Sequence, residues 1–269
     1  MSGLTFTLRA EPEERLDLSP LVPSRLDGSS EQEIAALPIG TTKRGLTVGD
    51  VFAITMGEAD AIRFDGGSAR FDNLGFAMQG GEIRITGDVG ACLGRRMAGG
   101  RLVVEGDAGP FAGSGLLGGE VVVGGNAGDR LAGPLGGEMA GMRGGFLHVT
   151  GSAGRRAADR MRRGVIVVDG DVGEDAASRM IAGTLLVGGR AADGAGTLMR
   201  RGTVVVTGGA SELGPTFLDN GLAELLALRL MARSYPGIGW IGERLARPMR
   251  RFGGDTAALG KGEVFVPAG

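Results

Sequence analysis

The sequence is poor in the residue types that build catalytic and metal centres, because its 269 residues include one cysteine, one histidine, one tyrosine and one tryptophan. With Cys92 as the only thiol, an intramolecular disulfide is excluded, and a reducing cytoplasm is the expected location. Metal sites made of paired cysteines or histidines are excluded as well. Aromatic residues make up 4% of the chain, so we expect thin layers of aliphatic side chains to fill the core.

The charge and hydropathy patterns give no support for a nucleic-acid or membrane partner. The formal net charge is -2, and no basic tail or surface of interleaved basic and aromatic residues is found. No stretch approaches the roughly 18 apolar residues of a membrane span. The first residues also lack the charged and apolar regions of a signal peptide, so we expect neither a leader nor a membrane anchor.

Glycine, by contrast, is abundant, and an internal repeat explains why. Each of the 54 glycines costs extra backbone entropy on folding, so their number requires a structural reason. Seven copies of one pattern begin at residues 82, 101, 120, 146, 165, 184 and 203, with a spacing of 19 residues except at one place. The exception is a seven-residue insertion at about 134–140. A looser eighth copy begins at Ala61.

Each unit combines a short strand with a glycine corner. The second and fourth positions are apolar, as in Ile83 and Ile85, which places alternate side chains on one face of a strand. The sixth position is glycine in every unit, and we expect these glycines to turn the chain at positive φ and to let neighbouring backbones approach closely. They are Gly87, Gly106, Gly125, Gly151, Gly170, Gly189 and Gly208.

The sixteenth position completes the pattern, because flexible thioethers suit an irregular interior better than they indicate a soft-metal site. It is occupied by Met78, Met97, Leu116, Met142, Met161, Met180 and Met199. The predicted fold is all-β: a right-handed, single-stranded parallel β-helix with about 19 residues per coil, whose coils stack by strand pairing. A left-handed hexapeptide solenoid, with the acyltransferase function usually tied to it, is disfavoured because a six-residue period counted from Ile83 reaches Arg95.

We expect three regions along the chain. Residues 1–60 are predicted to form an irregular N-terminal cap with a short strand or turn near 46–51, and residues 61–214 the repeat domain. Residues 215–269 are predicted to form a C-terminal tail with a helix near 222–232. At the outward third strand position the later units carry Val167, Leu186 and Val205, an apolar ladder that should not stay in water. We expect the tail, a partner protein, or both to cover it.

No catalytic constellation is found in the sequence. His148 takes an outward strand position without a cysteine or acidic neighbour at metal-ligand spacing, so we expect it to be a surface or interface residue. Cys92 is expected to be a small core residue rather than a reactive thiol. Residues 113–118 match the GxGxxG pattern, but these glycines are corners of the repeat, so nucleotide binding is not expected.

Arginine is the one polar residue type with a pattern in the repeat, and stacking is expected to bring many arginines to one edge. The candidate docking residues are Arg155, Arg156, Arg160, Arg162, Arg163, Arg200 and Arg201. In one interpretation this edge is solvated and partly neutralised by Asp159, Glu174 and Asp175. In the other it docks an acidic partner or a polyanionic cofactor, because guanidinium groups bind carboxylates well.

The repeated Gly-Asp-Val/Ala-Gly and Met-x-x-Gly motifs, as in 87–90 and 97–100, resemble the β-helical C-terminal domain of the glutamate synthase large chain. Over about residues 45–215 the chain more closely resembles the C subunit of formylmethanofuran dehydrogenase, a separate polypeptide of this size. Arginines number 27 against two lysines, as expected from a GC-rich bacterial genome. This ratio favours the bacterial formyltransferase/hydrolase complex over the archaeal molybdenum or tungsten dehydrogenase.

The resemblance implies a non-catalytic scaffold that assembles with an amidohydrolase-like A subunit, a B subunit and a formyltransferase-like D subunit. The complex is expected to move a formyl group from formyl-tetrahydromethanopterin to a methanofuran-type carrier and to hydrolyse it to formate, with zinc in the A subunit. The candidate arginines are then expected to attract the polyglutamyl tail of the carrier or an acidic partner face. A glutamate-synthase-like role with a companion glutamine amidotransferase chain, and a free-standing enzyme, are the alternatives.

Overall fold

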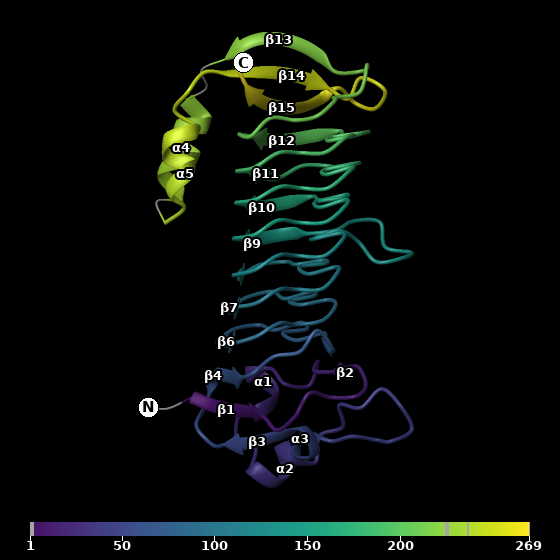
Figure 1. Ribbon diagram of the computed structural model, residues 1–269, viewed down its shortest axis with the longest axis vertical. Coiled ribbons are helices and arrows are strands. Elements are labelled where there is room, and N and C mark those ends of the chain that lie inside the picture. The colour runs from purple at the N-terminus through teal and green to yellow at the C-terminus, as the bar shows by residue number, and fades with distance from the viewer. Residues whose placement is uncertain (1–2, 224–225, 236, 269) are drawn as a thin grey trace.

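The computed structural model describes residues 3–223, 226–235 and 237–268, and a single mixed sheet connects its two ends (Figure 1). Thirteen strands form this sheet in the order β13-β14-β15-β12-β11-β10-β9-β8-β7-β6-β4-β1-β3. The repeat supplies β4 (Glu58–Asp65), β6 (Glu82–Ile85), β7 (Arg101–Val104), β8 (Glu120–Val123), β9 (Arg143–Val149), β10 (Arg163–Val168), β11 (Thr184–Val187) and β12 (Arg201–Val206). The all-β class expected from the sequence is therefore confirmed.

The repeat strands stack in register, so that equivalent positions of successive units lie side by side. Ile83 pairs with Leu102, and Val121 pairs with Leu147 in the same way across the insertion. A second parallel ladder of single bridges joins Val89, Ala108, Ala127, Ala153, Val172, Ala191 and Ala210. Each unit thus contributes to two ladders, and the insertion leaves both registers intact because it loops out from the stack (Figure 1).

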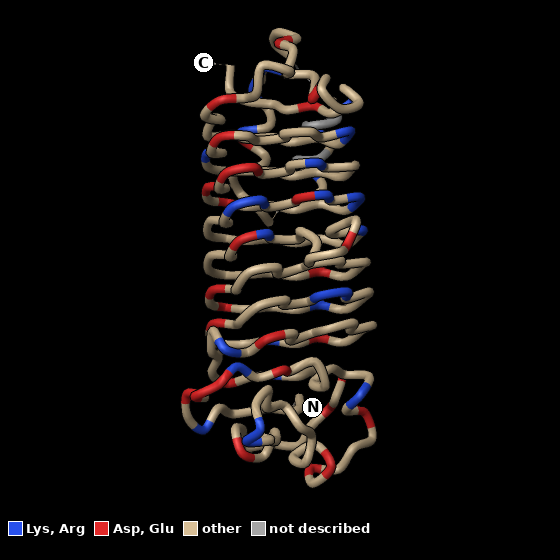
Figure 2. The backbone as a smooth tube through the Cα atoms, turned by 90° about the vertical axis from the view of Figure 1, so that its right-hand side faces the viewer, with Lys and Arg blue, Asp and Glu red and all other residues tan. Residues whose placement is uncertain are grey.

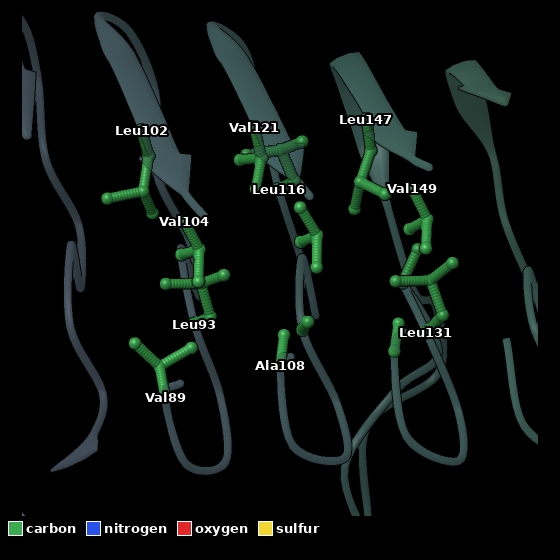
Figure 3. Packing of buried hydrophobic residues seen from close by; sticks show 14 of the residues in the cluster. Val89, Leu93, Leu102, Val104, Ala108, Leu116, Val121, Leu131, Leu147 and Val149 are labelled. Carbon is green, nitrogen blue, oxygen red and sulfur yellow. The ribbon is translucent and has the colours of Figure 1, made fainter. Parts of the chain in front are cut away.

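The interior between the two ladders is apolar and tightly filled. Figure 3 shows Leu102, Val104, Leu116 and Val121 of neighbouring units pointing toward one another in this interior. The six methionines and the leucine of the sixteenth position are all fully buried. Their role as core residues is confirmed, and no group of three or more possible metal ligands occurs among the described residues.

The corner glycines of the sixth position are required for a reason that differs in part from the expected one. None of the seven has a positive φ, so this part of the prediction was wrong. Close approach explains them instead: a Cβ on Gly87 would lie 2.7 Å from the backbone nitrogen of Gly67 in the preceding coil. Positive φ is found at the last glycine of each unit, for example 108° at Gly183.

At the edge of the repeat that carries many arginines, backbone hydrogen bonds between neighbouring units form a third column along the stack. Its backbone alternates into the left-handed region, with φ of 60° at Arg156, 61° at Ala158 and 52° at Arg160. The amide of Arg156 donates to Glu174 in the next unit, and that of Ala158 donates to Leu131 in the preceding one. These bonds offset the cost of the left-handed conformation. The sequence offered no sign of this arrangement at residues other than glycine.

The N-terminal end is more regular than the predicted irregular cap. It contains β1 (Gly3–Leu8), β2 (Leu16–Asp17), α1 (Pro23–Leu26), α2 (Glu31–Ala35), α3 (Val48–Val51) and β3 (Phe52–Thr55), while β2 pairs with β5 (Phe71–Asp72). The segment near 46–51 is a short helix rather than a strand or turn, and Thr47 and Asp50 form a capping box at its start. Strands β1 and β3 extend the large sheet, and Phe6, Phe52 and Phe64 pack beneath them.

The C-terminal end adds β13 (Leu218–Ala223), α4 (Leu226–Ser234), α5 (Gly239–Arg244), β14 (Met249–Gly254) and β15 (Lys261–Pro267). Strand β15 pairs in parallel with β12 and continues the stack. The helix predicted near 222–232 begins later, at Leu226, and residues 224 and 225 lie outside the described residues. Leu222 belongs to β13 because it pairs with Arg250 of β14. No helix among the described residues is long and apolar enough to cross a membrane.

The apolar ladder on the outer face is covered by the C-terminal tail, as expected. Val167, Leu186 and Val205 are fully buried in a cluster with residues of the tail. Those residues include Ile238, Ile241, Leu245, Met249 and Phe265. Coverage within the chain therefore explains why the later units carry apolar side chains at this position.

A polar contact locks the tail beside this cluster. The indole of Trp240 donates to the Asp169 carboxylate at 2.8 Å, and Nε2 of His148 lies 3.0 Å from both carboxylate oxygens. Burial raises the pKa of Asp169, but the hydrogen bonds from His148 and Trp240 outweigh it, so this pKa lies below its ordinary value. The sequence shows no acidic residue at metal-ligand spacing from His148, and the fold brings Asp169 to it from the next unit.

Replacing a corner glycine tests the close stacking of the coils. In Gly208→Ala the new Cβ would lie 2.5 Å from the carbonyl carbon of Gly189, and we expect a loss of about 2 kcal/mol in the free energy of unfolding. Urea denaturation measures the loss. The control is Gly136→Ala, whose Cβ meets nothing within 4 Å; equal stability of the two variants would contradict the stacking argument.

Acid titration tests the lock between Asp169 and the tail. A carboxyl with a depressed folded pKa stabilises the protein above its unfolded pKa of about 3.9, and this contribution disappears as the pH falls through the folded value. We therefore expect Asp169→Asn to be less stable than the original chain at pH 5 by about 1 kcal/mol. The difference should shrink as the pH falls below about 4. Urea unfolding across this range measures it, and a constant difference would contradict the assignment.

Candidate functional site

The structure divides the candidate arginines into paired and unpaired groups. Arg155 forms an ion pair with Glu174 at 2.8 Å, and both side chains are largely exposed. Arg156 and Arg179 approach the buried carboxylate of Asp159 at 3.5 and 3.1 Å. Burial raises the pKa of Asp159, and the surrounding arginines offset this only in part. Neutralisation by Asp159 and Glu174, one of the two interpretations, is thus what the structure shows for these arginines.

Arg160 lies beside the insertion that interrupts the repeat. Its guanidinium donates to the backbone oxygen of Glu138 at 3.2 Å. The Glu138 carboxylate in turn accepts hydrogen bonds from Arg95 at 2.7 Å and Arg96 at 3.0 Å, and from the amide of Leu135. Although burial raises the pKa of Glu138, these bonds hold it below its ordinary value. The insertion is therefore tied to the stack at several points.

The remaining four candidates line one groove. Arg162, Arg163, Arg200 and Arg201 surround a groove of about 550 Å³ together with Arg143, Ile181, Ala182 and Leu259. We call it the arginine groove. All five of its arginine side chains are exposed, and no carboxylate of the described residues lies within 4.0 Å of them. These five guanidinium groups are available for an external anion.

In-register pairing creates this concentration of charge. Arg143 and Arg163 are direct neighbours in the ladder between β9 and β10, and Arg201 pairs with Lys261 of β15. Neighbouring strands lie about 4.8 Å apart, and like charges placed opposite one another on a sheet are destabilising. A bound anion with several carboxylates would remove this repulsion, since guanidinium groups form strong bidentate bonds to carboxylates. Figure 2 shows basic and acidic positions interspersed along the rest of the stack.

A second groove of about 740 Å³ adjoins the arginine groove, and the two share Ile181, Arg200 and Leu259. We call it the Met139 groove. Its other lining residues are Met139, Arg160, Arg179, Leu198, Ala257 and Ala258. Sequence analysis did not identify Met139 or Leu259 as site residues. Met139 lies in the insertion, which the sequence shows as an interruption of the 19-residue spacing. Leu259 lies in the turn between β14 and β15, and no sequence pattern marks it as a site residue.

The residues considered as possible catalytic groups take structural places. Cys92 is half-buried at an edge position with a φ of 63°, rather than fully in the core, and burial raises the pKa of its thiol. A raised pKa disfavours the reactive thiolate. In the GxGxxG segment, Gly113 and Gly115 have positive φ and Ser114 is fully buried. The segment is thus part of the edge of the repeat and not a phosphate-binding turn before a helix.

Comparison with known proteins gives one close relative, although no family model matches the chain. Over 98% of its residues the chain is 50% identical to the C subunit of the formyltransferase/hydrolase complex Fhc of Methylorubrum extorquens, and it covers 99% of that protein. The chain belongs to the family of this C subunit. The family resemblance read from the repeat, and the choice of the formyltransferase/hydrolase version, are confirmed.

A solved structure agrees with this family assignment. The chain superposes with a TM-score of 0.93 and 45% identity on a chain of the X-ray crystal structure of the formyltransferase/hydrolase complex (FhcABCD) from Methylorubrum extorquens in complex with methylofuran. The match covers 98% of this chain and 100% of the other. Both ends of the stack are included, so the covering of the outer face by the tail belongs to the shared region.

Proposed function

We propose that this chain is the non-catalytic scaffold subunit of a formyltransferase/hydrolase complex of one-carbon metabolism. The observation that carries the proposal is its 50% identity to the C subunit of such a complex over nearly the whole length of both proteins. The complex transfers formyl from formyl-tetrahydromethanopterin to a methanofuran-type carrier and hydrolyses it to formate. The partners are an amidohydrolase-like A subunit with zinc, a B subunit and a formyltransferase-like D subunit, all in the cytoplasm.

The absence of a catalytic constellation in the described part of the chain supports a scaffold role. Its one histidine is engaged with Asp169, and the thiol of its one cysteine has a raised pKa. Acid-base or metal catalysis needs several titratable groups that converge on one pocket. The two grooves instead combine arginines with aliphatic side chains, which suits binding.

The same proposal includes the winding and division of the chain. We assign the stack to a right-handed parallel β-helix, with residues 1–60 as the N-terminal cap, 61–214 as the repeat domain and 215–269 as the C-terminal tail. The two in-register ladders and the 19-residue period support the assignment to a parallel β-helix. A rod of this kind offers long, rigid faces on which several subunits can assemble.

The arginine groove is proposed as the anion-binding part of the scaffold. Its occupant is a carboxylate-rich chain, either the polyglutamyl tail of the carrier or an acidic face of a partner. Arg162, Arg163, Arg200 and Arg201 carry this role. Arg155, Arg156 and Arg160 contribute less, because their guanidinium groups are already engaged within the chain.

Charge reversal tests the arginine groove in the assembled complex. We expect Arg162→Glu combined with Arg163→Glu to weaken carrier retention or complex yield at least about tenfold, because two attractive charges become repulsive. Native mass spectrometry of the complex, purified through the full-length tagged chain, measures both quantities. The control is Arg25→Glu combined with Arg190→Glu, which makes the same charge change at exposed arginines outside both grooves. Unchanged carrier content and unchanged yield in the first variant would contradict the proposal.

A further inference from the structure

Three exposed apolar side chains converge in the Met139 groove from distant parts of the sequence. Met139 is 81% exposed, Leu198 44% and Leu259 48%. They come from the insertion, the edge of the repeat and the turn before β15. Scattered apolar residues on a surface are normal, but a group gathered around a groove marks a place of interaction.

Met139, the most exposed of the three, follows Glu138, which is bonded to the stack. Glu138 fixes the insertion through hydrogen bonds from Arg95 and Arg96 and through the bond between its backbone oxygen and Arg160. Met139 is therefore presented to solvent by an anchored loop rather than by a freely moving one. Presenting a side chain in its bound position lowers the entropy cost of association.

The surroundings of these apolar residues resemble the anatomy of a protein interface. Arg160, Arg179 and Arg200 lie around the groove, and no carboxylate of the described residues lies within 4.0 Å of Arg200. Interfaces typically combine an apolar centre with a polar rim, and both methionine and arginine are enriched in them. A matching partner surface needs a large apolar side chain flanked by acidic residues.

We infer that the Met139 groove docks an acidic loop of another protein of the complex, which inserts a large apolar side chain between Met139 and Leu259. This inference rests on the proposed assembly. A polyglutamyl chain offers carboxylates to the arginines but nothing apolar to Met139. A second copy of this chain would bring the same arginines against one another, which disfavours self-association at this groove.

Substitution of the two apolar residues by aspartate tests the inference in the complete complex. The full-length tagged chain is co-expressed with the A, B and D subunits, and native mass spectrometry measures the fraction that retains them. We expect Met139→Asp and Leu259→Asp each to weaken retention at least about tenfold, as for a residue at the centre of an interface. Met139→Leu should retain the partners as well as the original chain does, because it keeps an apolar side chain of similar size.

The matched control is Met56→Asp, which introduces the same charge at a methionine that is 42% exposed near the opposite end of the stack. It should retain the partners fully, and the thermal midpoints of all variants should equal that of the original chain. Retention by Met139→Asp equal to that by Met56→Asp overturns the inference. Loss of carrier without loss of subunits also overturns it. Failure of the original chain to retain any of its partners refutes the proposed function itself.

Discussion

The structure depends on the in-register stacking of units, because each unit supplies hydrogen-bond partners for the backbone of the next. The amides and carbonyls of one coil are satisfied by the coils on either side, in the strand ladder, in the ladder of single bridges and along the arginine-rich edge. Buried backbone groups without partners are costly, so this complementarity keeps the period at 19 residues. It also explains the glycine content, since an added Cβ at the sixth position would collide with the backbone of the preceding coil.

Stacking also determines where charge accumulates. Equivalent positions of successive units become direct neighbours, so Arg143 meets Arg163 and Arg201 meets Lys261. Where the repeat supplies an acidic residue at the next position, as with Glu174 beside Arg155, the charge is neutralised within the chain. Where it does not, a basic groove remains open to solvent. The same geometry that stabilises the rod therefore generates the binding surface that we assign to the scaffold.

At its two ends and on its outer face, the stack has apolar surface that other parts of the chain cover. At the N-terminal end, phenylalanines of β1, β3 and β4 close the core. At the C-terminal end, β15 continues the stack while Trp240 and Asp169 hold the tail over the outer apolar ladder. The insertion, anchored by Glu138, leaves the stack to present Met139. The segments that depart from the repeat thus close the core, cover the outer face and expose Met139.

The sequence by itself determined the all-β class, the period of the stack, the core positions and the family, because all of these depend on residues at regular spacing. It also placed an apolar ladder on the outer face and correctly required that something cover it. The tertiary structure alone decided which arginines are paired and which are not. The carboxylate partner of a paired arginine can come from another unit, as Asp159 does for Arg179. The tertiary structure likewise brought Asp169 into contact with His148, and it placed Leu259 and Met139 along the same groove, although the separation of these residues along the chain follows no repeat.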